Sequence, residues 1–480
     1  MSYIILPFQF ERITEKETLL VNECGDFLFV SNDDFKLFVN HKLDEKSDIF
    51  YELKSHLMIA QEELEESIVK ISNRLRSKKA FLREFTCLHM MVITLRCNQR
   101  CKYCQVSCAE EDAYKYDMSE ETAKKVVDMI FQSPTDFPKI EFQGGEPTLN
   151  WNVITTTVEY AEKVAKEKNK NVEFVICSNL IGINEEQLLY CKEHDICLST
   201  SLDGTKEIHN KCRVTKQETG TYDTFNEKLV LARKYVGYDK VGALMTTHAY
   251  SLDKLKDVID EYCRQGMDGI FIRSLNPYGF AAEDADTLGY DMKVFVERYL
   301  EALNYILEIN KKTYFPELFA TLLFSRILTP FSTGFVDLQS PAGAGISGVI
   351  YDFDGSVFPS DEARMLARMG DRHFCLGNVY NNTYKEIFAG QKLKNITRSA
   401  CVEITPPCAY CGYQAYCGCD PVRNYLETGS ELRNMTNSPF CKKHKGIISG
   451  LFKILKNADE TTMNIIWSWI NHNPSLVKRK

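Results

Sequence analysis

Between residues 88 and 275, short apolar segments alternate regularly with segments whose apolar residues recur at helical spacing. This alternation is typical of βα units built on a parallel sheet. Six strands in strict order predict an α/β fold with a partial (β/α)6 TIM-like barrel, in which chemistry gathers at the C-terminal ends of the strands. The predicted strands are residues 88–94, 139–143, 171–178, 195–201, 239–247 and 269–275. The predicted helices between them are residues 119–132, 152–168, 185–193, 222–235 and 251–265.

The segments that flank the predicted barrel have a different character. Two short apolar segments near the N-terminus, followed by two helix-like stretches, predict a small α/β appendage. A chain of 480 residues is also too long for one ordinary domain. We therefore expect four parts: an N-terminal α/β module at 1–80, the barrel at 81–312, a cysteine-rich domain at 313–445 and a C-terminal helix at 446–480.

Composition excludes several classes of function. No apolar run approaches the roughly 18 to 20 residues of a membrane span, so no membrane association is expected. The formal net charge of −8 disfavours nucleic acid as the main partner, because phosphate backbones generally bind basic surfaces. The first residues lack the basic flank and cleavage site of a secretory signal, so we expect a cytoplasmic protein.

The chain contains 18 cysteines, and many of them are clustered. A reducing compartment disfavours disulfides, so this number favours metal binding or catalysis. Three cysteines lie between residues 97 and 104, with Cys108 just beyond, and five lie between residues 408 and 441. Isolated cysteines are commonly buried small hydrophobes. This interpretation applies to Cys24, Cys87, Cys177, Cys191, Cys197, Cys212 and Cys263.

The first cysteine group directly follows the first predicted barrel strand. Cys97, Cys101 and Cys104 have the spacing C-x3-C-x2-C, which lets three thiolates converge on one cluster. Three ligands instead of four leave one iron of a four-iron cluster open to an exogenous ligand. Two alternatives stay open: a structural zinc site that needs Cys108 or a distant residue as its fourth ligand, and chance spacing.

This group resembles the signature of the radical S-adenosylmethionine (radical SAM) superfamily, which places the same triplet after the first strand and an aromatic residue, here Tyr103, before the last cysteine. The resemblance covers roughly residues 86–310. It implies a [4Fe-4S] cluster whose open iron chelates S-adenosylmethionine. An electron from the cluster would cleave this cofactor to a 5′-deoxyadenosyl radical, while the protein orients it.

Later strand ends carry further matches to the family. The GGEP motif follows the second strand, and glycine permits close backbone approach there. The resemblance implies that Glu146 binds the cofactor's amino group, that a Ser-Asn pair contacts the ribose, and that a serine and an arginine hold the carboxylate. Taken singly, each polar residue could equally be an ordinary loop residue. The expected cofactor-binding residues are Gly144, Gly145, Glu146, Ser178, Asn179, Ser201 and Arg213.

The second cysteine group resembles the SPASM domain of radical SAM enzymes that modify peptides and proteins. The family pattern has seven cysteines for two auxiliary clusters, but this chain has Ser360 and Pro421 at two of those positions and no cysteine shortly before Gly355. We therefore expect one auxiliary [4Fe-4S] cluster, with zinc as the alternative. Its expected ligands are Cys408, Cys411, Cys417 and Cys441, whereas Cys375, Cys401 and Cys419 are expected to be bystanders.

A narrower resemblance spans nearly the whole chain. The segments LPFQFERI, TLRCNQRCKYCQVS, IEFQGGEPTLN, SPAGAG and SDEARMLARMGD are similar to the radical SAM maturase of the His-Xaa-Ser system. This resemblance implies a precursor peptide or small His-Xaa-Ser repeat protein as substrate, a second radical SAM partner enzyme, and a reductant such as flavodoxin or ferredoxin. Two local interpretations stay open: residues 360–366 either face the substrate or begin a solvated helix, and the N-terminal module either docks a peptide strand or caps the barrel.

Three functions are therefore considered. The leading hypothesis is a maturase that abstracts a hydrogen from a ribosomally made peptide or small protein. The second is oxidation of a protein serine or cysteine, as in sulfatase-maturating enzymes, although this chain lacks their full seven-cysteine pattern. The third is a non-catalytic iron-sulfur or zinc protein, which would fail to cleave S-adenosylmethionine.

Overall fold

The computed structural model describes residues 3–432, 436 and 438–476. Residues 1–2, 433–435, 437 and 477–480, which fall inside three of the expected domains, lie outside the described residues. The chain forms two compact units. The first comprises residues 1–83, 320–343 and 398–480, and the second comprises residues 84–319 and 344–397. Because each unit is assembled from separated stretches, the domain boundaries at 80, 312 and 445 stay a prediction.

The second unit contains the expected parallel sheet. Five of the six predicted strands form, and they lie side by side in chain order. They are β6 (Leu88–Thr94), β7 (Lys139–Gly144), β8 (Glu173–Cys177), β9 (Cys197–Ser201) and β10 (Val241–Leu244). The predicted sixth strand, 269–275, is wrong as a strand. It retains only single bridges, among them Thr247 to Ser274 with a 2.8 Å hydrogen bond from Thr247 N to Arg273 O.

The opposite edge of the sheet is extended by residues from the C-terminal half of the chain. β11 (Gly348–Tyr351) pairs in parallel with β6. β12 (Ser356–Phe358) and β13 (Gly377–Asn378) then continue the sheet in antiparallel order. Residues 344–397, which we assigned to the cysteine-rich domain, therefore complete the barrel unit.

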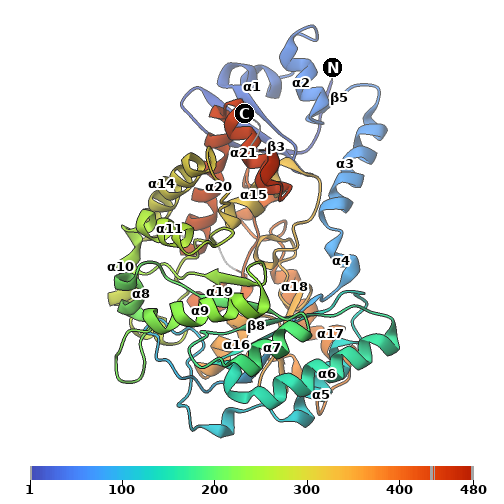
Figure 1. Ribbon diagram of the computed structural model, residues 1–480. Helices are drawn as coiled ribbons and strands as arrows, with labels where there is room; N and C mark the ends of the chain where they lie inside the picture. The colour runs from blue at the N-terminus through green and yellow to red at the C-terminus, as the bar shows by residue number, and fades with distance from the viewer. Residues whose placement is uncertain (1–2, 433–435, 437, 477–480) are drawn as a thin grey trace. The chain divides into compact units, whose positions relative to one another are not determined.

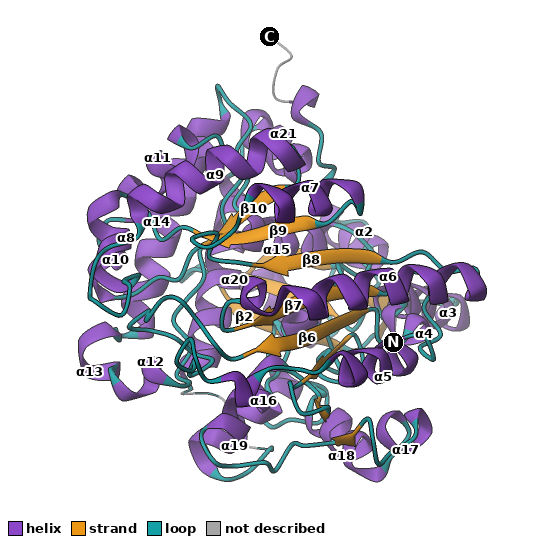
Figure 2. Ribbon diagram, turned by 60° about the horizontal axis from the view of Figure 1, so that its bottom comes forward, coloured by secondary structure: helices purple, strands orange, loops and turns teal. Residues whose placement is uncertain are grey.

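Amphipathic helices cover one face of the parallel strands (Figure 2). Four of the five predicted helices are confirmed within a few residues of their expected ends. They are α5 (Glu120–Ile130), α6 (Trp151–Lys168), α7 (Glu185–Glu193) and α9 (Tyr222–Val236). The fifth is divided into α10 (Ala249–Leu252) and α11 (Leu255–Arg264). Caps explain several starts: the Ser119 side chain accepts from Thr122 N, and Asn184 and Gln187 form a capping box.

The first unit holds a three-stranded antiparallel sheet in the order β2-β3-β4. Its strands are β2 (Phe8–Arg12), β3 (Glu17–Asn22) and β4 (Phe27–Ser31), followed by α1 (Asn32–Val39), α2 (Asp48–Ser55) and α3 (Leu64–Lys78). The single helical stretch predicted at 48–75 is interrupted. Leu57 adopts a φ of 55°, which no helix continues, and the chain then forms β5 (Ile59–Ala60), paired with β1 (Ile4–Ile5).

The closing helical region also belongs to the first unit, together with the N-terminal strands and helices (Figure 1). It forms α20 (Pro439–Asn457) and α21 (Glu460–Ile470) instead of one helix. The Phe452 ring contacts Phe27, with ring centroids 5.0 Å apart, and Tyr416 at 5.4 Å. None of the described helices is long and apolar enough to cross a membrane.

The other described helices are distributed over the two units. They are α4 (Phe81–Glu84), α8 (Lys206–Cys212), α12 (Phe280–Glu283), α13 (Ala285–Leu288), α14 (Met292–Asn310), α15 (Leu318–Leu328), α16 (Asp361–Arg368), α17 (Tyr384–Phe388), α18 (Gln391–Ser399) and α19 (Pro421–Thr428).

A buried ion pair fixes the loop that follows β6. Arg96 Nε and one terminal nitrogen each donate to a different Asp117 oxygen at 2.8 Å, and its other terminal nitrogen donates to Glu111 O at 3.0 Å. Thr94 Oγ1 also donates to Asp117. Both ends of the loop are thus tied to one guanidinium.

We expect Asp117→Ala to lower the free energy of unfolding of this unit by about 3 kcal/mol, because it leaves a buried guanidinium without its counter-ion. Urea unfolding and hydrogen exchange of the loop amides measure this. Asp33→Ala, which removes an exposed ion pair with Lys36, is the control and should change little. An Asp117 variant as stable as the parent would show that the pair does not hold the loop.

Candidate functional site

The first cysteine group lies on the loop after β6, at the C-terminal ends of the parallel strands. Cys97 is buried, whereas Cys101 and Cys104 are half-buried. Two N–H donors point at their sulfurs: Asn179 Nδ2 lies 3.9 Å from Cys97 Sγ, and an Arg213 terminal nitrogen lies 3.9 Å from Cys101 Sγ. Such donors stabilise thiolate ligands, so the residues present suit a cysteine-bound metal cluster.

Cys108 lies beside this group as well. A hydrogen bond from Cys108 lowers the pKa of the Cys104 thiol to about 7, although burial opposes the shift. Hydrogen bonds with Cys104 and Cys97 in turn raise the pKa of Cys108. Cys104 is therefore the better thiolate of this pair at neutral pH.

The two glycines of the GGEP motif allow a close approach of the backbone of the cysteine loop. A Cβ on Gly144 would overlap the carbonyl oxygen of Thr94, and a Cβ on Gly145 would overlap that of Arg96. Gly145 N donates to Thr94 O at 2.8 Å, and Glu146 N donates to Arg96 O at 2.7 Å. The glycines thus fasten the cysteine loop to the end of β7.

Glu146 is buried and connects the ends of β7 and β8. Its carboxylate accepts from Thr148 N at 3.2 Å and from Ser178 Oγ at 2.8 Å on one oxygen, and from Asn179 N at 2.8 Å on the other. Burial raises the pKa of Glu146, and these donors oppose that shift. The second oxygen accepts one bond, so it can accept another from a ligand's ammonium group.

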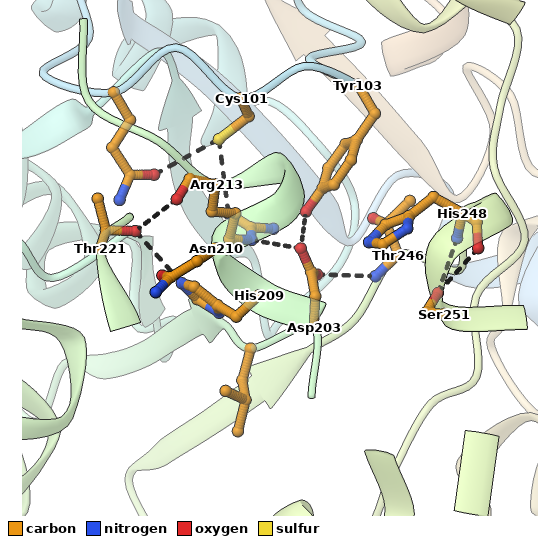
Figure 3. A network of polar contacts seen from close by, with 12 residues as sticks. Cys101, Tyr103, Asp203, His209, Asn210, Arg213, Thr221, Thr246, His248 and Ser251 are labelled. Atoms are coloured by element: carbon orange, nitrogen blue, oxygen red, sulfur yellow. Dashed lines mark hydrogen bonds and ion pairs between the residues drawn. The ribbon is translucent and has the colours of Figure 1, made fainter. Parts of the chain in front are cut away.

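A second buried carboxylate, Asp203, organises the other side of the site (Figure 3). It accepts from Arg213 Nε at 2.9 Å, from Thr246 N at 3.2 Å and from the Tyr103 hydroxyl. Burial alone would raise the pKa of Asp203, but the charge of Arg213 lowers it below its usual range. The ion pair fixes Arg213 beside Cys101.

Asp203 is not among the predicted site residues, although it lies two residues after Ser201. Tyr103 joins it to His248, whose ring stacks on Tyr103 at 5.8 Å and whose two ring nitrogens have no hydrogen-bond partner among the described residues. Burial lowers the pKa of His248, so this ring is neutral. His248 lies in none of the motifs, so no sequence pattern indicated that it belongs to the site.

The predicted cofactor residues are therefore brought to one edge of the sheet. Glu146, Ser178 and Asn179 share hydrogen bonds, and Arg213 lies across the cysteine loop from them. Ser201 ends β9, two residues before Asp203, and is half-buried. The roles of these residues toward a cofactor stay a prediction.

Helix α16 contributes Arg364, whose two terminal guanidinium nitrogens have no hydrogen-bond acceptor among the described residues. Arg364 is fully buried, and its Nε lies 3.3 Å from Asp361. Both terminal nitrogens lack a hydrogen-bond partner among the described residues. Its charge lowers the pKa of Cys104, although more weakly than the Cys108 hydrogen bond does. The interpretation of residues 360–366 as a solvated helix start is wrong for Arg364.

The second cysteine group lies on two short 3-10 turns and the first turn of α20. Burial raises the pKa of Cys417, and the charges of Cys411, Cys408 and Cys441 raise it further, so the four sulfurs are neighbours. Among the described residues, no three histidine, cysteine or carboxylate side chains converge as ligands of a single metal ion. A four-iron cluster instead binds its thiolates at separate irons.

The positions that lack the expected SPASM cysteines have structural roles. The Ser360 side chain caps α16 by accepting from Ala363 N at 3.3 Å. Pro421 is the first residue of α19, a position whose N–H has no acceptor within the helix, so the missing N–H of proline costs no hydrogen bond. Of the other cysteines, Cys419 is buried and contacts Ser399 O, and Cys263 is exposed, so its prediction as a buried hydrophobe is wrong. The remaining isolated cysteines are buried or half-buried.

A four-iron cluster held by three cysteines would supply the electron that cleaves S-adenosylmethionine. The chain's own residues would bind and orient: the cysteine triplet would hold the cluster, Glu146 would accept from an ammonium group, and the ion-paired Arg213 would donate to a carboxylate.

Comparison with known proteins agrees with this geometry. Residues 91–289 match the Radical SAM superfamily. This part of the chain has the mixed α/β radical SAM fold, and the similarity indicates that the protein is an enzyme.

More particular similarities extend beyond that domain. A cysteine-type anaerobic sulfatase-maturating enzyme of Clostridium novyi is 23% identical over 335 residues, covering 67% of this chain and 84% of that enzyme. The structure of native anSMEcpe with bound AdoMet and Cp18Cys peptide is 20% identical, with a TM-score of 0.63 over 77% of this chain and 98% of the other. Streptococcus suis SuiB bound to precursor peptide SuiA is 13% identical, with a TM-score of 0.53 over 91% and 99%.

Replacing Cys108 distinguishes a four-iron cluster with three cysteine ligands from a zinc site with four. If three cysteines hold the cluster, Cys108→Ser should retain about four irons at this site, whereas Cys104→Ala should lose them. Iron analysis after anaerobic reconstitution measures this, with the second group replaced by alanine to remove its iron. Loss of the metal in Cys108→Ser, with zinc retained by the parent, would instead support a closed four-cysteine site.

Proposed function

We propose that this enzyme is a maturase that cleaves S-adenosylmethionine reductively and uses the 5′-deoxyadenosyl radical to modify a ribosomally made peptide or small protein. The observation that carries the proposal is the arrangement around the cysteine triplet. Asn179, after β8, and Arg213, at the end of α8, donate toward its sulfurs, and the buried Glu146 lies beside Asn179. The proposed ligands and cofactor residues are those predicted from the sequence.

Two kinds of similar protein support a peptide substrate. The anSMEcpe structure holds a bound peptide, and SuiB is bound to a precursor peptide. We propose a His-Xaa-Ser type protein as the substrate here, with a second radical SAM enzyme as partner and a flavodoxin or ferredoxin as reductant. The N-terminal module, with its three-stranded sheet, is a candidate for docking a peptide strand.

Oxidation of a protein cysteine or serine is a comparably supported second candidate. The similarity to sulfatase-maturating enzymes covers two thirds of this chain. The residues Ser360 and Pro421 count against the full cluster set of that group, because both positions serve helix starts instead. We propose a single auxiliary cluster at Cys408, Cys411, Cys417 and Cys441 in a cytoplasmic enzyme.

Anaerobic reconstitution tests the proposal. We expect about eight irons per chain, from two four-iron clusters, and formation of 5′-deoxyadenosine from S-adenosylmethionine after reduction. Replacing Cys97, Cys101 and Cys104 with alanine should abolish that product and leave about four irons. Twelve irons per chain would contradict the prediction that one of the two auxiliary clusters has lost its ligands. A protein that holds eight irons but does not cleave S-adenosylmethionine would support the non-catalytic alternative. Incubation with the small protein encoded beside the gene, or with a sulfatase-derived cysteine peptide, separates the two substrate classes by mass spectrometry.

Arg364 is proposed to hold the substrate, because a buried guanidinium with unsatisfied donors requires acceptor oxygens from elsewhere. In Arg364→Gln, the fraction of cofactor cleavage that yields modified peptide should fall about tenfold or more. Product ratios from chromatography measure it. Arg372→Gln, which removes an exposed guanidinium, is the matched control. An unchanged ratio in Arg364→Gln, in protein of parental stability, would exclude this role.

A further inference from the structure

The first unit contains a small cavity that none of the roles above uses. It is lined by residues from α3, from the segment 320–343 and from the loop that carries the second cysteine group. Its volume is about 110 Å³. Its lining includes three cationic side chains, those of Lys78, Lys79 and Arg326. We therefore asked which of these charges the chain itself neutralises.

Lys79 is neutralised by its own partner. Its Nζ lies 2.6 Å from Glu403 Oε1 in an ion pair. The other Glu403 oxygen accepts from the Ser340 hydroxyl, whose oxygen also accepts from Val402 N at 3.1 Å. Both Glu403 oxygens thus already have a donor, and in the described part of the chain Glu403 forms no ion pair with Lys78 or Arg326.

Lys78 and Arg326 donate only to neutral acceptors in the described part of the chain. Lys78 Nζ donates to Arg326 O at 3.0 Å and lies 5.5 Å from the centre of the Tyr416 ring. Arg326 is about nine-tenths buried and donates to Tyr416 O at 3.2 Å and Ala415 O at 3.1 Å. Neither forms an ion pair with a carboxylate there.

Two further carboxylates lie near these cations. Glu23 also lines the cavity but is exposed, and Asp26 is paired with Arg74, although its charge partly opposes the lowering of the Lys78 pKa. Burial, followed by repulsion from Arg326, lowers the pKa of Lys78 to about 8. Lys78 is thus destabilised as a cation, as expected for a charge that lies beside a second cation and forms no ion pair of its own.

The size of the cavity limits what can neutralise them. A volume of 110 Å³ equals a few water molecules at about 30 Å³ each. Pockets for nucleotides and drug-sized ligands begin at about 300 Å³, so these are excluded. One phosphate, sulfate or carboxylate group fits, and its oxygens can accept from both an ammonium and a guanidinium.

We propose that this cavity is a binding site for one small oxyanion, held between Lys78 and Arg326. The anion is either a free phosphate or the carboxylate of a bound peptide, since both present the same acceptor oxygens. Arg326 also holds the carbonyl oxygens of the two residues before Cys417. The occupied site therefore connects anion binding to the loop that carries the second cysteine group.

Calorimetric titration of the full, anaerobically purified chain tests the site. Sodium phosphate and sodium acetate serve as probes, at an ionic strength held constant with sodium chloride. We expect the parent to bind one anion per chain and Lys78→Met to bind it about tenfold more weakly or worse. Lys78→Arg keeps the charge and should retain the site. Lys70→Met removes an exposed lysine of the same helix, paired with Glu66, and should bind like the parent.

The two probes distinguish the sources. Binding of phosphate without acetate indicates a free tetrahedral anion, whereas binding of acetate indicates a peptide carboxylate. Thermal unfolding in chloride checks that each variant is folded. The proposal is overturned if neither probe binds more tightly than chloride, or if folded Lys78→Met binds as tightly as the parent.

Discussion

The close approach of two glycines to a cysteine loop underlies the rest of this structure. Gly144 and Gly145 sit so near the carbonyl groups of Thr94 and Arg96 that no side chain fits between them. Their backbone, with that of Glu146, hydrogen-bonds this loop at both places. The cysteine triplet is thereby attached to the end of β7 before any ligand binds. The GGEP motif, which resembles a cofactor-binding motif, therefore also holds the cysteine loop in place.

Two buried carboxylates extend this anchoring across the sheet. Glu146 collects donors from the ends of β7 and β8, and Asp203 collects them from Tyr103, Arg213 and Thr246. A buried carboxylate is stable only with such donors, so each one fixes the loops around it. The result is a preorganised site in which N–H groups already face the cysteine sulfurs. Preorganisation of this kind is the protein's contribution to chemistry that a cofactor performs.

The structure also separates satisfied cations from unsatisfied ones. Arg96 and Arg213 each have a carboxylate partner, Asp117 and Asp203, and both serve to position loops. Arg364 is paired with Asp361 through Nε alone, and its two terminal nitrogens lack an acceptor in the described part of the chain. Lys78 and Arg326 form no ion pair with a carboxylate there. Unpaired buried cations are costly, and this cost is the reason to expect ligand oxygens beside them.

Much of this protein could be read from its sequence. The alternation of apolar strands and amphipathic helices determined five of the parallel strands and four of the helices, because local periodicity fixes which face of an element is buried. The C-x3-C-x2-C and GGEP motifs likewise located the site, since parallel strands bring their C-terminal ends to one edge. Other features depended on contacts between distant residues. The addition of β11 to β6, the pairing of Asp203 with Arg213 and the burial of Arg364 join segments with no local pattern in common. Only the tertiary structure decides such pairs, because burial and charge compensation are properties of the surroundings and not of the chain nearby.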